Sequence, residues 1–176
     1  MNIVATPFEL AKDLKNPMGS HHERRYLVDR AVWAPQGAAV HIKQCHLIDQ
    51  RERLAGLHID GADARLTIHG IADDATATEF EDTLAAGPAT LLFDSMCAQP
   101  VLDLHRFREL HQGRAWEIDV YDGPNAGLVL ARTVLAATDE TVELPAWVVK
   151  DVSADPHYDN ASLLNHPFNA WGRPGR

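Results

Sequence analysis

The segment Trp116-Glu117-Ile118-Asp119-Val120 alternates apolar and acidic residues, and it decides the fold class of this chain. Successive side chains of a β-strand point to opposite faces, so the three apolar residues share one face and both carboxylates share the other. Because the first face is wholly apolar, it is expected to pack against a core. If helices cover that apolar side, the acidic side lines an interior.

The same pattern predicts eight strands, joined mostly by tight antiparallel connections. They span residues 24–29, 39–47, 53–59, 64–70, 76–84, 101–110, 115–122 and 128–136. A helix is expected after Gly87-Pro88, where apolar residues recur at helical spacing. Eight strands suffice to close a barrel with a filled or ligand-holding interior. We therefore predict an α+β fold, an eight-stranded antiparallel β-barrel, or tunnel, with surrounding helices.

Composition limits the classes of partner. The 176 residues fit one domain, which we place at 21–176 behind a helical N-terminal extension at 1–20. Acidic residues outnumber basic ones by 25 to 16, which argues against nucleic acid and anionic membranes as partners. The chain shows neither a membrane-spanning apolar run nor a signal-peptide pattern. Cys45 and Cys97 are too few for a disulfide framework, so we expect a cytoplasmic protein.

Charged and histidine side chains gather on one parity of most predicted strands. They are Glu23, Arg25, His41, Lys43, His58, His69, Glu79, Glu81, Arg106, Glu117, Asp119 and Arg132. A strand that faces solvent alternates in the same way, so the pattern alone gives a solvated face and a ligand-lined interior equal weight. The wholly apolar parity around Ile118 favours the lined interior.

Six motifs occur in a fixed order along the chain. They are HERRYLV (22–28), LTIHG (66–70), EFE (79–81), WEIDVYDG (116–123), AGLVLA (126–131) and PAWVVKDVSADPHYDNASLL (145–164). This ordered set resembles the CYTH family, also called triphosphate tunnel metalloenzymes, over about residues 21–168. The resemblance implies a β tunnel that binds a triphosphate and hydrolyses or cyclises it with Mg²⁺ or Mn²⁺. Basic side chains would hold the phosphates, and carboxylates would hold the metal.

The resemblance assigns roles residue by residue. The implied metal ligands are Glu23, Glu79, Glu81, Glu117 and Asp119. The implied phosphate-binding residues are Arg25, His41, Lys43, His58, His69 and Arg106, and Arg132 is expected to join them as a new cation on the same parity. The charges depart from the family pattern at several of these positions. Histidines 41, 58 and 69 stand where cations are expected, and Arg132 and Val134 replace the acidic pair of the last strand.

Three readings fit these departures, because fold does not fix function. In the first, the chain is a divergent, divalent-metal-dependent phosphohydrolase acting on a triphosphate-containing small molecule or short inorganic polyphosphate. In the second, histidines and carboxylates bind Zn²⁺, Mn²⁺ or Ni²⁺ in a barrel with a changed substrate. In the third, the barrel is a non-catalytic module that binds a ligand or partner. We favour the first reading, with a small anionic phosphate compound as ligand; the oligomeric state is left open.

Overall fold

The computed structural model describes residues 22–50, 53–71, 77–97, 100–135, 137 and 140–172. The chain divides into two compact units. Ile42–Val101 belongs to the first unit, whereas Gly19–His41 and Leu102–Arg176 form the second. The helical extension predicted for 1–20 lies outside the described residues. No helix among the described residues is long and apolar enough to cross a membrane.

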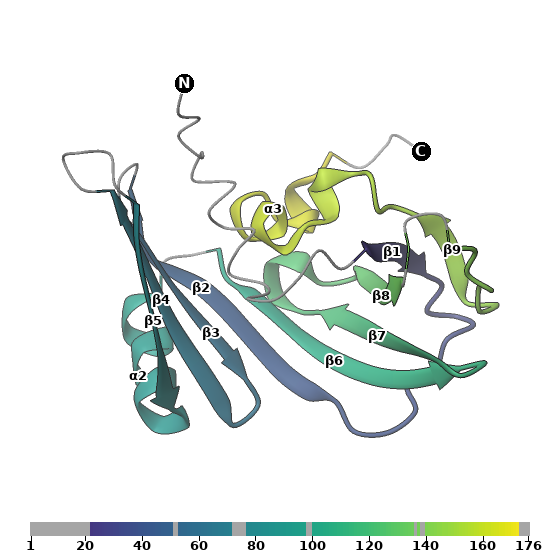
Figure 1. The fold of residues 1–176 in the computed structure, drawn as a ribbon, viewed down its shortest axis with the longest axis horizontal. Helices are drawn as coiled ribbons and strands as arrows, with labels where there is room; N and C mark the ends of the chain where they lie inside the picture. The colour runs from purple at the N-terminus through teal and green to yellow at the C-terminus, as the bar shows by residue number, and fades with distance from the viewer. Residues whose placement is uncertain are drawn as a thin grey trace. The chain divides into compact units, whose positions relative to one another are not determined.

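The first unit is a four-stranded antiparallel sheet with one helix (Figure 1). Its elements are β2 (Val40–Gln50), β3 (Arg53–Asp60), β4 (Asp63–Ile71), β5 (Ala77–Ala85) and α2 (Ala86–Met96), with strand order β5-β4-β3-β2. The apolar residues Cys45, Leu57 and Ile59 share a buried cluster with Ala89 of α2. One face of this sheet is therefore covered by the helix, and the other carries the polar parity of its strands.

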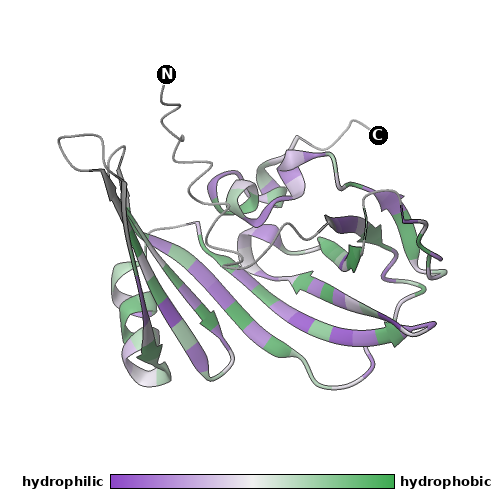
Figure 2. Ribbon diagram, in the orientation of Figure 1, coloured by the Kyte–Doolittle hydropathy of each residue, from purple (hydrophilic) through white to green (hydrophobic). Residues whose placement is uncertain are grey.

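The second unit is a five-stranded antiparallel sheet in the order β6-β7-β8-β1-β9. Its strands are β1 (His22–Val28), β6 (Leu102–His111), β7 (Arg114–Tyr121), β8 (Val129–Leu135) and β9 (Val148–Asp151). The short helices η1 (Gly123–Asn125), η2 (Pro156–Tyr158), α3 (Asn160–Asn165) and η3 (Phe168–Ala170) complete it. Hydrophilic and hydrophobic residues alternate along β6 and β7 in Figure 2, as a sheet with two different faces requires.

An aromatic core covers one face of the second unit. Trp116 and Ile118 are fully buried there, and the Trp116 ring lies 5.6 Å from that of Tyr26 and 5.3 Å from that of Trp147. The alternation at 116–120 thus predicted the buried face correctly. The core is closed by aromatic side chains from loops and from the end of β1, where we had expected helices.

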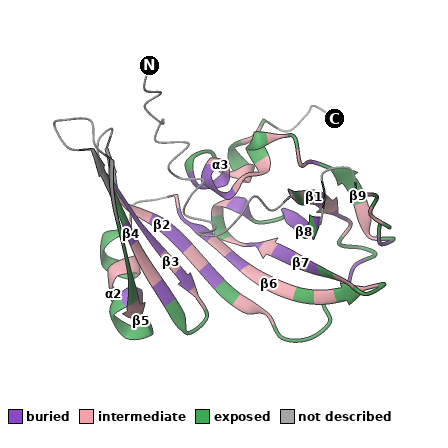
Figure 3. Ribbon diagram, viewed as in Figure 1, coloured by how far each residue is buried: buried purple, intermediate pink, exposed green. Residues whose placement is uncertain are grey.

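The C-terminal segment fixes one end of the opposite face. The Tyr121 hydroxyl donates to Oδ1 of Asn160 at 2.8 Å, and burial followed by the charge of Asp119 raises the pKa of Tyr121 well above its usual value. Asn125, fully buried after β7, donates to the carbonyl of Leu163 at 3.3 Å and accepts from the backbone of Phe168 at 2.8 Å. Figure 3 shows the buried positions of α3 and β8 that result.

The predicted α+β class and antiparallel pairing are confirmed, but the predicted closed eight-stranded barrel is wrong in two respects. The described residues contain nine strands, because Val148–Asp151 forms β9 beside β1. Neither unit's sheet closes on itself: one has four strands and the other five. The short β9 is mostly exposed and lacks a two-residue alternation, so the sequence carried no strand signal there.

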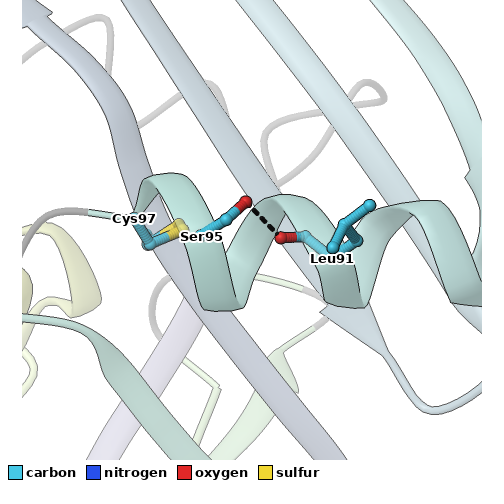
Figure 4. The surroundings of a disulfide bond; sticks show 4 residues. Leu91, Ser95 and Cys97 are labelled. Atoms are coloured by element: carbon cyan, nitrogen blue, oxygen red, sulfur yellow. Dashed lines mark hydrogen bonds between the residues drawn. A yellow bond between two sulfur atoms is a disulfide. The ribbon is translucent and has the colours of Figure 1, made fainter.

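A disulfide ties α2 to the first unit's sheet. Cys97 follows the last turn of α2, as Figure 4 shows, and pairs with the fully buried Cys45 of β2 across a Cα–Cα distance of 5.7 Å. Two cysteines were too few to indicate a framework, and the sequence alone gave no reason to expect this bond. The two cysteines are 52 positions apart in the sequence, which makes the bond's effect on the unfolded chain large.

Reducing this bond is expected to lower the free energy of unfolding by about 4 kcal/mol, the entropy of a loop of this length. Urea unfolding with and without a thiol reductant measures the loss. The double variant Cys45→Ala/Cys97→Ala is the control, since reductant should leave its stability unchanged. Equal stability of the oxidised and reduced wild type would contradict the prediction.

Candidate functional site

The polar face of the second unit gathers six predicted site residues from four neighbouring strands. They are Glu23 and Arg25 of β1, Arg106 of β6, Glu117 and Asp119 of β7, and Arg132 of β8. The strand register explains the grouping, because Arg132 is paired with Arg25 on one side and Glu117 on the other. Asp119 is likewise paired with Arg106. We call this set the ionic cluster.

Asp119 is the centre of the ionic cluster and has no exposed surface. Arg106 binds it as a fork, with Nε donating to Oδ1 at 2.7 Å and Nη2 to Oδ2 at 3.0 Å. Nη2 of Arg132 also donates to Oδ2, at 2.9 Å. Both oxygens of Asp119 are therefore taken by guanidinium groups, in the geometry that makes charge-assisted hydrogen bonds strong.

The charge of Arg106 is secured by its neighbours. Burial acts to lower the pKa of this guanidinium, but the charges of Asp119 and Glu117 outweigh burial and raise it. Arg106 is consequently a permanent cation on a largely buried side chain.

Glu117 and Glu23 form the outer part of the ionic cluster, and each is about one third exposed. Arg108 Nε donates to Glu117 Oε1 at 3.0 Å, while Arg132 Nη2 and Arg106 Nη1 each lie 3.4 Å from Oε2. Glu23 lies between two arginines: Arg25 Nε is 3.5 Å from Oε1 and Arg132 Nη1 is 3.7 Å from Oε2. Glu117 and Glu23 thus lie between the buried arginines and solvent.

Two further residues, Arg108 and Asp159, pair with this set and are counted in the ionic cluster from here on; the sequence analysis missed both. Arg108 lies two residues beyond Arg106 on β6, so the same parity rule points to it. Asp159 forms an ion pair with Arg25 from the segment before α3. No strand periodicity covers Asp159, and only the fold shows that it reaches the sheet.

An open cleft of about 640 Å³ adjoins the ionic cluster. It is lined by Glu23, Gln112, Gly113, Arg114, Ala115, Glu117, Arg132, Thr133, Val134 and Glu140. Arg114 is held on its wall by the Val134 carbonyl at 2.9 Å and by an ion pair with Glu140. The cleft has the size of a small-molecule site, and Glu23, Glu117 and Arg132 connect it to the ionic cluster.

His41 does not join the ionic cluster. Its Nε2 lies 2.6 Å from Oδ1 of Asp103, and its ring stacks on that of His105 at 4.6 Å between centroids. Asp103 and His105 occupy the parity of β6 opposite to that of Arg106, so this pair lies on the other side of the strand. His105 in turn lies 2.9 Å from Asp122. The phosphate-binding role predicted for His41 has no support from this placement.

The predicted site residues of the first unit fall on both faces of its sheet. Strand register places His58 on one face, and His69 pairs directly with Glu79 on that face while Glu81 pairs with Thr67. Glu81 is exposed and lies 3.3 Å from Arg65. Nothing is described of the side chains of His69 and Glu79.

Lys43 corrects the prediction for β2. Its Nζ lies 5.0 Å from the centre of the Phe93 ring of α2, so the side chain points to the helix-covered face. On β2 it is Gln44, paired with His58, that lies on the polar face.

The carboxylates predicted to hold a metal in the second unit do not fit one as they are arranged. In the part of the chain that the structure describes, no group of three or more His, Cys, Asp or Glu side chains is disposed to hold a metal ion. The reason in the ionic cluster is chemical: both oxygens of Asp119 and of Glu117 already face guanidinium groups. A hard cation such as Mg²⁺ needs such oxygens for itself.

Comparison with known proteins agrees with the fold. A protein of Acetivibrio thermocellus named inorganic triphosphatase is 24% identical over 151 residues, covering 86% of this chain and 97% of the relative. The crystal structure of the inorganic triphosphatase NE1496 matches with a TM-score of 0.69 at 22% identity, covering 85% of this chain and 97% of that one. A second structure, of the hypothetical protein NE1496, gives the same TM-score and identity. No family model matches the chain.

These observations define the class: an antiparallel β protein with the fold of a solved triphosphatase and a face of interleaved arginines and carboxylates. The six ordered motifs and the triphosphatase relative agree with that class. The chain resembles the CYTH, or triphosphate tunnel, family, with charged residues that diverge from the family pattern.

Proposed function

We propose that this chain is a triphosphatase-like hydrolase whose substrate is a triphosphate-containing small molecule or a short inorganic polyphosphate. One observation carries the proposal: the largely buried arginines Arg25, Arg106 and Arg132 lie together on one sheet face, and Arg132 borders an open cleft. The inorganic triphosphatase relative, matched over nearly its whole length, supports the same substrate class.

The chemistry of the arginines suits a phosphate chain. A guanidinium presents a planar fork that matches two phosphate oxygens, and it stays charged at any physiological pH. Nε of Arg132 is buried and has no hydrogen-bond acceptor among the described residues, so this donor of the guanidinium is not committed to the surrounding carboxylates. Phosphoryl transfer depends on positioning and charge stabilisation, which fixed cations provide.

The reaction is hydrolysis of the terminal phosphoanhydride bond. A water oxygen attacks the terminal phosphorus, the bond from that phosphorus to the bridging oxygen breaks, and inorganic phosphate leaves the shortened chain. Glu117 borders the cleft and is about one third exposed, so we assign its carboxylate to orient the attacking water and accept its proton.

Phosphate release tests this proposal directly. Inorganic triphosphate, ATP and thiamine triphosphate are incubated with the protein in Mg²⁺, in Mn²⁺ and in EDTA. We expect turnover of at least one of them and a loss of about 10²–10⁴-fold in Glu117→Gln, the range of a general-base contribution. The EDTA arm tests the predicted metal dependence. No turnover of any substrate, together with a silent Glu117→Gln, would end the enzyme proposal.

A second candidate is a non-catalytic module that binds the same anion. The observation in its favour is that every arginine of the ionic cluster already faces a carboxylate, so an anion must compete with Glu23, Glu117 and Asp159. Binding of inorganic triphosphate without turnover would identify this function. Stabilisation by Zn²⁺ or Ni²⁺ in a thermal-shift panel would instead favour a histidine-based metal site.

A further inference from the structure

Three carboxylates of the ionic cluster converge on a single positive group. Arg132 lies 2.9 Å from Oδ2 of Asp119, 3.4 Å from Oε2 of Glu117 and 3.7 Å from Oε2 of Glu23, measured from its Nη atoms. The three acids come from β1 and β7, the two strands that flank the strand of Arg132. Only about one tenth of the Arg132 side chain is exposed.

Such a convergence of carboxylate oxygens is the arrangement that a hard divalent cation ordinarily occupies. Here a guanidinium occupies it, and its forked donors satisfy oxygens that a metal ion would otherwise bind. We propose that Arg132 is a built-in cation, which takes the place of a divalent metal ion in this cluster and excludes one from it.

The charges of the cluster agree with this assignment. The four arginines Arg25, Arg106, Arg108 and Arg132 face the four carboxylates Glu23, Glu117, Asp119 and Asp159. With Arg132 in place the four positive and four negative side chains balance, so the cluster has no excess negative charge to attract an added metal ion. Exchanging Arg132 for a carboxylate changes the charge by two and adds an oxygen ligand where the guanidinium lies.

Metal binding, measured without substrate, is the test. Mn²⁺ binding to the full chain is followed by electron paramagnetic resonance and by thermal shift, in wild type, Arg132→Glu and Arg108→Glu. The control Arg108→Glu makes the same charge change in the same cluster, but at a side chain that is 62% exposed. We expect Arg132→Glu alone to bind one Mn²⁺, about tenfold or more tighter than wild type or Arg108→Glu, with a melting temperature that rises on adding Mn²⁺.

Several results would overturn the inference. One is wild-type binding of a Mn²⁺ ion that Glu117→Gln removes; another is a folded Arg132→Glu that binds Mn²⁺ no better than wild type. Equal gains in Arg132→Glu and Arg108→Glu would also overturn it, because net charge alone would then be responsible.

The folding of Arg132→Glu is informative as well. If this variant folds only when Mn²⁺ is present, the inference is supported. If it does not fold in either condition, Arg132→Gln replaces it, and a melting temperature unmoved by Mn²⁺ then counts against the inference. Because no step uses turnover, this inference and the proposed hydrolase activity can fail separately.

Discussion

Replacing Asp119 by alanine is expected to lower the free energy of unfolding by about 3–5 kcal/mol, the cost of breaking a buried ion pair. The substitution leaves Arg106 and Arg132, both largely buried, without the carboxylate that their Nε and Nη atoms bind. Uncompensated buried charge is costly because the lost partner is not replaced by water. Urea unfolding followed by tryptophan fluorescence measures the change, since Trp116 lies on the same strand.

The matched control is Asp151→Ala. Asp151 also pairs with an arginine, Arg24 at 3.1 Å, but both side chains are about 40% exposed. An exposed pair contributes about 0–1 kcal/mol, so this variant should be nearly as stable as wild type. Similar losses in the two variants would mean that the buried position of Asp119 has no special importance, and the ionic cluster would lose its structural role.

Replacing Arg106 by alanine is expected to reduce kcat/KM for the best triphosphate substrate by about 10²–10³-fold, the effect of removing one fixed donor from a charge-stabilising site. Arg106 lies across from Asp119 and contacts Glu117, which borders the cleft, so these two carboxylates hold its guanidinium in place. Initial rates over a range of substrate concentrations separate the effect on kcat from the effect on KM.

Arg24→Ala is the control for this activity experiment. Arg24 precedes Arg25 on β1 and so points to the opposite face of the sheet, where it pairs with Asp151. We expect its kcat/KM to stay within about twofold of wild type, as for a surface substitution remote from the site. Circular dichroism of both variants checks that they are folded. A fully active, folded Arg106→Ala would remove the ionic cluster from the reaction.

Much of the fold could be predicted because alternation is strong wherever one face is buried. Trp116 and Ile118 show this on β7, where the apolar residues of one parity pack into the aromatic core. The prediction was wrong for β2, because both of its parities carry polar residues: Lys43 reaches the helix side, while Gln44 is buried on the other. Alternation cannot assign faces when the two are equally polar.

The six first-named residues of the ionic cluster followed from strand parity, but the roles of its carboxylates did not. Whether Asp119 binds a metal or an arginine depends on what the neighbouring strands place opposite it. Strand register decides which residue lies opposite: it pairs Asp119 with Arg106 and Glu117 with Arg132. Register depends on turns and long-range packing, so a pattern along one strand does not contain it. Asp159 was missed for the same reason, because it reaches Arg25 from 134 positions away in the chain.

The most direct test of the account is calorimetric binding of a methylene-bridged triphosphate analogue, which cannot be hydrolysed, to wild type and Arg106→Ala in EDTA. If the buried arginines hold the phosphates, wild type binds the analogue without a divalent cation, and Arg106→Ala binds it at least about tenfold more weakly, the loss of one charge-assisted fork. Absence of binding to wild type, or equal affinity in the two proteins, would contradict the claim that this face is an anion site.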